Sequence, residues 1–235
     1  MAVRTSPAGG QALPGWVRTR AGADPGTVHL TVVEPAAVTA DAATRCCTLL
    51  AAAGYRRAVT NAMAEVDTAA LVAAGFRVAE RLDLLGRGLE DLPARPARPA
   101  PPGLRRTRDL DAVAALDRAA FGARGLDRAA VTDALDATPR ARLRIAGASG
   151  APIGYAVTGL AGSRAYVQRL AVHPDARRGG LARALLFDGL RWARRRRART
   201  AVVNTHRDND AARALYRSSG FVVLPRGLVV LERTL

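Results

Sequence analysis

The chain carries the same order of sequence signals twice, and this internal repeat limits the folds open to it. In the second half the signals are V-H-P (172–174), a long helix, A-V-V-N (201–204) and R-A-L-Y-R-S-S-G-F (213–221). The first half has V-E-P (33–35), A-V-T-N (58–61) and A-A-L-V-A-A-G-F (69–76) at matching places. Strands that alternate with helices predict a mixed α/β fold in two related copies. Nothing in the first copy matches residues 104–150, so the first copy is truncated.

A proline-rich segment separates the two copies. Residues 93–103 read P-A-R-P-A-R-P-A-P-P-G, a composition typical of an extended and stiff spacer. The sequence therefore predicts a first domain at 1–92, a linker at 93–103 and a second domain at 104–235. A chain of 235 residues, 49% of them hydrophobic, is long enough to give two small domains packed cores.

The two predicted domains differ in charge. The formal net charge is +16, and all of the basic residues are arginine. Residues 1–92 carry nine arginines and nine acidic residues, whereas residues 104–235 carry 25 arginines and 11 acidic residues. This asymmetry indicates that the second domain meets an anion, either a phosphorylated small molecule or a nucleic acid.

The sequence also bears on compartment and on metal binding. The first 25 residues lack a continuous apolar segment, and no apolar run in the chain approaches 18 residues. We therefore expect neither a signal peptide nor a transmembrane helix, and no membrane partner. Cys46 and Cys47 are adjacent and are the only cysteines, which favours neither a disulfide nor a four-ligand metal site. The expected location is the cytoplasm.

The stretch L-A-V-H-P-D-A-R-R-G-G-L-A (170–182) has the composition of a phosphate cradle. The apolar strand end consists of Leu170, Ala171 and Val172, and a helix is predicted over 179–197. The first N–H groups of a helix have no intrahelical partner, and the helix dipole adds partial positive charge there. Gly180 allows close approach of a ligand, and Arg177 and Arg178 add full charges. The alternative is an ordinary helix start in an arginine-rich chain.

Periodicity predicts the elements around this stretch. Asp109 can cap a helix that carries Leu110, Val113, Leu116 and Ala120 at helical spacing. The other predicted elements are a strand at 104–108, a helix at 126–137, strands at 142–146, 153–159, 165–172 and 200–205, a helix at 209–218, and strands at 221–224 and 228–233.

The second half resembles the GNAT superfamily of acyl-CoA-dependent N-acyltransferases over residues 104–235. The resemblance rests on R-x-x-G-x-A at Arg177, Gly180 and Ala182, preceded by L-A-V-H-P, and on N-D-A-A-R-A-L-Y-R-S-S-G-F (209–221). It implies the GNAT fold, a mixed central sheet flanked by helices in which the strands matching 166–172 and 200–205 splay apart. The first half resembles a degenerate, partial GNAT copy, as in tandem GNAT proteins. It lacks the glycines and arginines of the cradle.

The resemblance also implies a site and its ligands. Acetyl-CoA would be the co-substrate and a primary amine the acceptor, and no metal is implied. The backbone of Leu170, Ala171 and Val172 would pair with the pantetheine arm, which Asn209 would also contact. Tyr216 stands where many members carry the general acid, and Leu71 replaces it in the first copy. The residues implied to hold the pyrophosphate are Arg177, Arg178, Gly179, Gly180, Leu181 and Ala182.

The general base is left open by the sequence. Many relatives place a Glu on one of the splayed strands, but Tyr166, Gln168 and Asn204 occupy the matching face here. His206 would share the strand face of Asn204 if the strand extends that far, and its ordinary pKa suits proton abstraction. The alternatives are a water relay through Asn204 or Gln168, with His206 as a loop residue. Tyr216 likewise has the alternative of a half-buried aromatic beside Phe221.

These observations favour an acetyl-CoA-dependent N-acetyltransferase acting by direct transfer to a small molecule or a protein N-terminus. The alternative is a non-catalytic CoA-sensing or protein/RNA-interaction module on the same scaffold. The run R-W-A-R-R-R-R-A-R (191–199) is interpreted as a solvated helix end rather than a nucleic-acid or ribosome contact. Only Trp192 interleaves with its arginines, which does not support a platform for base stacking.

Overall fold

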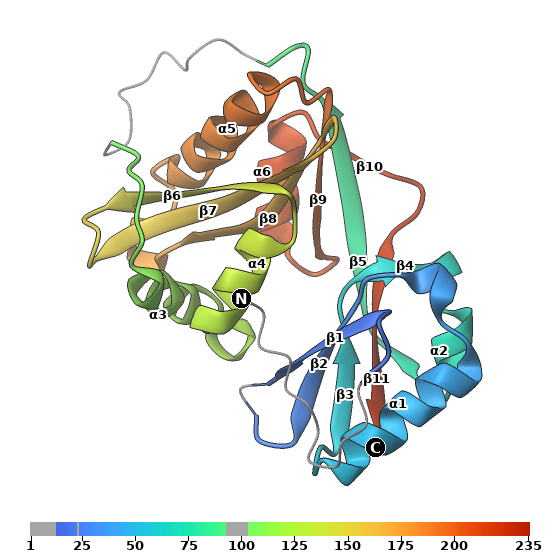
Figure 1. Ribbon diagram of the computed structural model, residues 1–235. Helices are drawn as coiled ribbons and strands as arrows, with labels where there is room; N and C mark the ends of the chain where they lie inside the picture. The colour runs from blue at the N-terminus through green and yellow to red at the C-terminus, as the bar shows by residue number, and fades with distance from the viewer. Residues whose placement is uncertain (1–12, 23, 93–102) are drawn as a thin grey trace. The chain divides into compact units, whose positions relative to one another are not determined.

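The computed structural model describes residues 13–22, 24–92 and 103–235. Contacts divide the chain into two compact units (Figure 1). Unit 1 comprises Met1–Leu84, Thr205–Asp208 and Leu224–Leu235, and unit 2 comprises Leu85–Asn204 and Asn209–Val223. Among the described residues, no helix has both the length and the apolar character needed to span a bilayer.

Unit 1 is a mixed sheet with two helices. Its elements are β1 (Val17–Ala21), β2 (Thr27–Val32), α1 (Ala40–Ala52), β3 (Arg57–Thr60), β4 (Met63–Ala64), α2 (Ala69–Ala73), most of β5 (Arg77–Gly88), and β11 (Leu228–Thr234). The strand order is β1-β2-β3-β11-β5, and β4 pairs with β11. The pair β2–β3 is parallel, whereas β1–β2, β11–β3 and β11–β5 are antiparallel.

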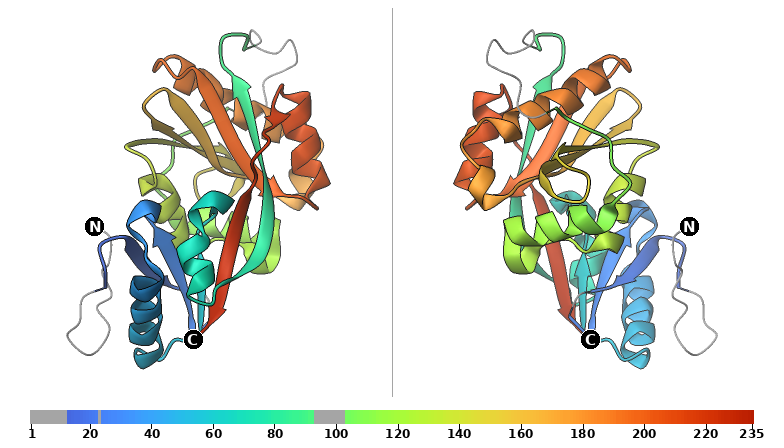
Figure 2. Two further views of the ribbon diagram at one scale, coloured as in Figure 1. Left: turned by 90° about the vertical axis from the view of Figure 1, so that its right-hand side faces the viewer. Right: turned by 90° about the vertical axis from the view of Figure 1, so that its left-hand side faces the viewer.

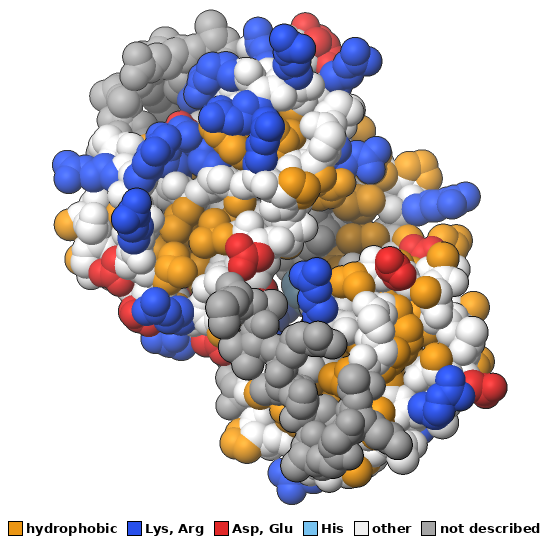
Figure 3. All heavy atoms as spheres, viewed as in Figure 1, with side chains coloured by type: hydrophobic (Ala, Val, Ile, Leu, Met, Phe, Trp, Pro, Cys, Tyr) orange, Lys and Arg blue, Asp and Glu red, His pale blue; other side chains and the backbone are white. Residues whose placement is uncertain are grey.

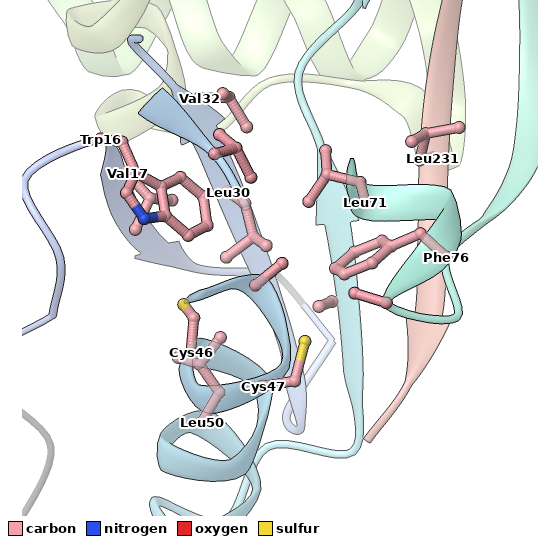
Figure 4. Close-up of a cluster of buried hydrophobic side chains, with 14 of the residues drawn as sticks. Trp16, Val17, Leu30, Val32, Cys46, Cys47, Leu50, Leu71, Phe76 and Leu231 are labelled. Carbon is pink, nitrogen blue, oxygen red and sulfur yellow. The ribbon is translucent and has the colours of Figure 1, made fainter. Parts of the chain in front are cut away.

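The core of unit 1 lies between the sheet and its helices. Leu30 of β2 and Leu231 of β11 pack with Leu50 of α1 and Leu71 of α2 (Figure 4). The adjacent cysteines of α1 are buried in the same cluster and are free thiols. Burial raises the pKa of the Cys46 thiol to about 12. Both cysteines are therefore core residues, because the helix turns each of them toward apolar neighbours.

Unit 2 is a sheet with helices on both faces. Its elements are α3 (Leu110–Phe121), α4 (Arg128–Asp136), β6 (Arg140–Gly147), β7 (Pro152–Ala161), β8 (Arg164–Val172), α5 (Leu181–Arg194), most of β9 (Thr200–His206), α6 (Asp210–Ser218) and β10 (Val222–Val223). The strand order is β5-β9-β8-β7-β6, with β10 on β5. The pairs β6–β7 and β7–β8 are antiparallel, and β8–β9 is parallel.

Alternation along the strands places the helices of unit 2. Tyr155 and Val157 of β7 pack in the cluster that holds α3 and α4, whereas Ala156 packs with Leu181 and Leu185 of α5. Because successive side chains of a strand point to opposite faces, α5 covers one face of the sheet and α3 the other (Figures 1 and 2). This arrangement leaves the carboxyl end of β8 directly before the start of α5.

The internal repeat is visible in the topology. In unit 1 an antiparallel pair, β1–β2, leads through α1 to a strand parallel to β2. In unit 2 the antiparallel pair β7–β8 leads through α5 to β9, which is parallel to β8. The mixed α/β fold in two related copies is therefore confirmed, and the described residues of the first copy hold no counterparts of α3 and α4.

The two units differ from the predicted domains at both ends. Residues 224–235 belong to unit 1, because β11 pairs with β3 and β5. Residues 85–92 belong to unit 2, where Leu85 and Leu89 are fully buried. Backbone pairing and burial decide membership here. The first copy gives the end of β5 to unit 2, and the second copy gives β11 and the end of β9 to unit 1. The predicted linker lies outside the described residues apart from Gly103.

The segment 104–108 is not a strand. Arg105 makes a single bridge to Ile145 of β6, in which each backbone N–H donates to the other's carbonyl. The helix predicted at 179–197 is shorter, because Gly180 in a left-handed conformation starts it at Leu181 and the chain leaves it after Arg194.

Candidate functional site

The carboxyl half of β8 has one edge outside the parallel ladder. The β8–β9 pairs run from Arg164↔Thr200 to Val167↔Val203, whereas the β7–β8 pairs continue to Gly154↔Val172. Residues 169–172 therefore pair with β7 alone, and their other edge is available to an extended ligand. The β7–β8 register shifts so that Gln168 is an extra residue, which is a β-bulge. The predicted splay thus falls at Leu170, Ala171 and Val172.

The N-terminus of α5 is open. Gly180 is its N-cap, with φ +79°, and no side chain of the described chain caps it. The N-caps Thr39, Asp109, Asp127 and Asn209 each accept a backbone N–H at the starts of α1, α3, α4 and α6. A Cβ at Gly180 would meet nothing within 4 Å. The first N–H groups of this helix have no intrahelical partner, and the open space at Gly180 leaves room for an anion beside them.

Arg177 has a structural role in this turn. Its Nε donates to the carbonyl of Val172 at 3.4 Å and its Nη2 to that of Ala120 at 3.0 Å. Its backbone N–H donates to Pro174. The side chain thus joins the end of β8 to the end of α3. Arg178, the other arginine expected to add charge to the cradle, is exposed and has a left-handed φ of 66°.

Tyr216 lies in the core of unit 2. Its side chain is buried on α6, and its ring centroid is 5.7 Å from that of Phe221. Burial raises the pKa of Tyr216 to about 12, and the charge of Arg169 opposes this rise. The phenol therefore stays protonated at neutral pH and can act as a donor. The Oδ1 atom of Asn209 accepts the N–H of Ala212 at 3.1 Å and so caps α6.

The two base candidates lie on β9. The strand extends through His206, so Asn204 and His206 share one strand face. Asn204 is exposed. The Nε2 atom of His206 lies 3.4 Å from Oε2 of Glu80, a pairing within unit 1. No local pattern indicates this carboxylate partner, because Glu80 lies 126 positions earlier in the chain.

Asp117, Tyr155 and Arg169 form a cluster next to β8 that the sequence analysis did not predict. Asp117 of α3 is fully buried and accepts hydrogen bonds from Tyr155 (2.6 Å) and Arg169 (2.9 and 2.7 Å). Burial alone would lower the pKa of Arg169, but the hydrogen bonds and charge of Asp117 outweigh it and raise this pKa. The sequence pattern that could have indicated the cluster is an acidic residue on the apolar face of α3, four positions after Val113. This cluster fixes α3 against β8.

Comparisons with known proteins agree with this geometry. Residues 110–221 match the model of the Acetyltransferase (GNAT) family. A search of the curated proteins gave no match.

Solved structures share the fold of the chain. A tandem GNAT protein from the clavulanic acid biosynthesis pathway, solved without AcCoA, is 17% identical, with a TM-score of 0.66 over 93% of this chain and 78% of that one. A GCN5-related N-acetyltransferase from Kribbella flavida is 18% identical, with a TM-score of 0.58 over 87% and 80%. A third, from Sphaerobacter thermophilus, is 18% identical, with a TM-score of 0.54 over 89% and 73%. Residues 110–221 are therefore similar to the GNAT acetyltransferase family, and the chain shares the fold of the tandem GNAT protein.

Proposed function

We propose that this protein is an acetyl-CoA-dependent N-acetyltransferase that transfers an acetyl group directly to a primary amine. The observation that carries the proposal is the uncapped start of α5, directly after the open edge of β8. Helix N-termini bind phosphates, and an open strand edge binds amides. One ligand that carries both groups at adjacent positions is acetyl-CoA.

The described residues fit this ligand. The backbone groups of Leu170, Ala171 and Val172 would pair with the pantetheine amides. The N–H groups of residues 178–182 and the charge of Arg178 would hold the pyrophosphate, whereas Arg177 shapes the turn. The side-chain amide of Asn209 can contact the pantetheine arm while its oxygen caps α6. The open space at Gly180 leaves room for the phosphates.

Residues near the proposed acetyl-CoA position would supply the chemistry of transfer. In direct transfer the amine nitrogen bonds to the thioester carbonyl carbon, and the carbon–sulfur bond breaks. A strand N–H near Val172 would stabilise the oxyanion. The protonated phenol of Tyr216 would give a proton to the departing sulfur, and His206, or water held by Asn204, would take the proton lost by the amine.

Binding is tested by isothermal titration calorimetry with acetyl-CoA. Gly180→Glu places a carboxylate at the phosphate cradle and is expected to abolish binding. Gly162→Glu is the matched control, because Gly162 also has a positive φ (+55°) and open space around its Cβ. Unchanged affinity in Gly180→Glu, or equal loss in both variants, would refute the cradle.

Turnover is tested by release of CoA from acetyl-CoA with small amines, an aminoglycoside and peptides with free N-termini. Tyr216→Phe is expected to lower kcat about a hundredfold or more with little change in acetyl-CoA affinity. His206→Ala and Asn204→Ala distinguish the two routes for the amine proton. Tight binding without turnover on any acceptor would instead support a CoA-sensing module, in keeping with the absence of a carboxylate at Tyr166, Gln168 and Asn204.

A further inference from the structure

A groove in unit 2 is lined mainly by arginines. It lies between the edge strand β6, the segment before α3 and the C-terminal end of α5, with a volume of about 640 Å³. Its lining includes Arg106, Thr107, Arg140, Arg142, Trp192 and Arg196. We call it the arginine groove. Figure 3 shows arginine side chains gathered over α5 and β6, and none of these residues belongs to the acetyl-CoA site described above.

The strand β6 presents a row of arginines to this side of the sheet. Its sequence R-A-R-L-R places Arg140, Arg142 and Arg144 on one face, because side chains alternate along a strand. Asp188 of α5 fixes the direction of the row, since its carboxylate pairs with Arg142 at 2.8 Å and lies 3.6 Å from Arg144. The row therefore faces α5, and β6 ends the sheet on that side.

Positive charge in the groove exceeds the negative charge that faces it. Asp188 is the one carboxylate that pairs with the β6 row among the described residues. Burial lowers the pKa of the Arg144 guanidinium, and the charges of Arg142 and Arg106 lower it further against the opposing effect of Asp188. The Nε atom of Arg144 is the atom that lies 3.6 Å from Oδ2 of Asp188, so Arg142 and Arg144 share one carboxylate. Guanidinium groups crowded in this way favour a bound anion.

The basic surface continues beyond the groove. The arginines at 194–197 and Arg199 are exposed at the end of α5, next to Arg196 of the groove wall. A ligand that neutralises all of them must be an extended polyanion rather than a single phosphate. From the sequence alone, this arginine run is interpreted as a solvated helix end. In the folded protein, Arg106 and the arginines of β6 lie on the same side as this run.

The chemistry of the lining favours a phosphate backbone. The ring of Trp192 is buried, and the guanidinium of Arg196 lies 4.9 Å from its centroid. The groove offers charge, forked N–H donors and the half-buried side chains of Ala141 and Leu143, but no exposed aromatic ring for bases. We propose that the arginine groove and the end of α5 bind the phosphate backbone of a nucleic acid without base specificity.

Fluorescence anisotropy of the full chain with a labelled oligo(U) RNA of about 12 nucleotides tests this proposal. Binding is expected to weaken steeply as salt rises from about 50 to 200 mM. The double variant Arg140→Glu/Arg196→Glu is expected to lose about tenfold or more in affinity, and the log–log salt slope is expected to fall by about two. Arg18→Glu/Arg45→Glu, two exposed arginines of unit 1, changes net charge equally and is expected to bind within about twofold of the parent.

Circular dichroism and melting temperature establish that both double variants are folded. The milder double variant Arg140→Gln/Arg196→Gln is expected to lose less affinity for the RNA than the Glu variant. Equal losses in the groove and control variants would overturn the proposal, because binding would then follow net charge alone. Tighter binding of a labelled poly-glutamate peptide than of the RNA would also overturn it in favour of an acidic protein partner. An oligo(dT) of the same length is expected to bind about as well as oligo(U), whereas tight binding of tripolyphosphate that excludes the RNA would reassign the groove to a small phosphorylated ligand.

Discussion

The side-chain oxygen of Asn61 accepts the backbone N–H of Val32 at 2.9 Å. Asn61 also donates its own backbone N–H to Leu30 at 2.8 Å. In the internal repeat Asn61 matches Asn204, and Val32 matches Ala171. The first copy thus satisfies with its own amide the strand N–H that the second copy is proposed to offer to pantetheine. With α1 capped by Thr39, this bond explains why the first copy keeps the fold without the site.

Replacement of Asn61 by Ala is expected to lower the free energy of unfolding by about 1 kcal/mol, because the N–H of Val32 loses its partner. Urea denaturation measures the change. Asn204→Ala is the matched control, since its side chain is exposed, and is expected to alter stability by less than about 0.5 kcal/mol. Calorimetry with acetyl-CoA should still give one site per chain in Asn61→Ala. Equal destabilisation in the two variants would contradict this view of the first copy.

At Gly180 the effect of backbone strain can be measured separately from the effect of steric room for a side chain. A Cβ there meets nothing within 4 Å, but φ is +79°. Gly180→Ala should therefore cost about 1–2 kcal/mol through strain alone and weaken acetyl-CoA binding by displacing the start of α5. Gly179→Ala has its nearest contact at 3.9 Å without a left-handed φ, and should change stability by less than about 0.5 kcal/mol. Similar effects at both glycines would count against a strained cradle.

Asp117 should be the most sensitive acidic residue of α3. Asp117→Asn leaves the partly buried guanidinium of Arg169 without its counter-charge, and is expected to cost about 3 kcal/mol. Asp111→Asn, on the same helix, breaks only an exposed pair with Arg128 and should cost about 1 kcal/mol or less. Chemical denaturation of the two variants decides the point. A mild effect at Asp117 would show that the cluster does not hold α3 on β8.

Residues 1–92 contribute to the core of unit 2 through the end of β5. Leu85 is fully buried there, so Leu85→Ala is expected to destabilise the protein by about 2–5 kcal/mol. Val78, on the same strand but 40% exposed, is the control and should tolerate Ala within about 1 kcal/mol. Deletion of residues 1–92 removes β5 altogether. A soluble, fully active remainder from that deletion would contradict a structural role for the first half.

Stability should fall at alkaline pH partly because of Cys46. Its pKa is raised to about 12 by burial, whereas a thiol in the unfolded chain ionises near about 8.5. Between these values the unfolded state releases a proton that the folded state keeps, so the free energy of unfolding decreases as pH rises. Cys46→Ala should flatten this slope in denaturation curves measured between about pH 8.5 and 10.5. Labelling of the native thiol by a disulfide reagent at about pH 8 should be slow, and rapid labelling would contradict the burial.

Much of the fold follows from local sequence. The pairs Val-Glu-Pro/Val-His-Pro and the two Gly-Phe helix ends predict two copies of one strand–helix–strand unit, because prolines and glycines fix the local backbone. Helical spacing of Leu110, Val113 and Leu116 predicts α3 and its buried face. Gly179 and Gly180 likewise mark the helix start that makes the cradle. These signals act within a few residues, so a single chain displays them directly.

Long-range pairing decided the rest. No local sequence pattern predicts that β11 lies between β3 and β5, or that the end of β5 belongs to unit 2. Hydrogen bonding between strands does not depend on how far apart the strands are in the sequence. The same holds for Glu80 beside His206, for Asp117 with Arg169, and for Arg106 in the arginine groove. The sequence by itself determined two related copies and the glycine-marked helix start of the proposed phosphate cradle. The tertiary structure decided which charged side chains lie together. Burial and a nearby charged partner then determine what each of these side chains does.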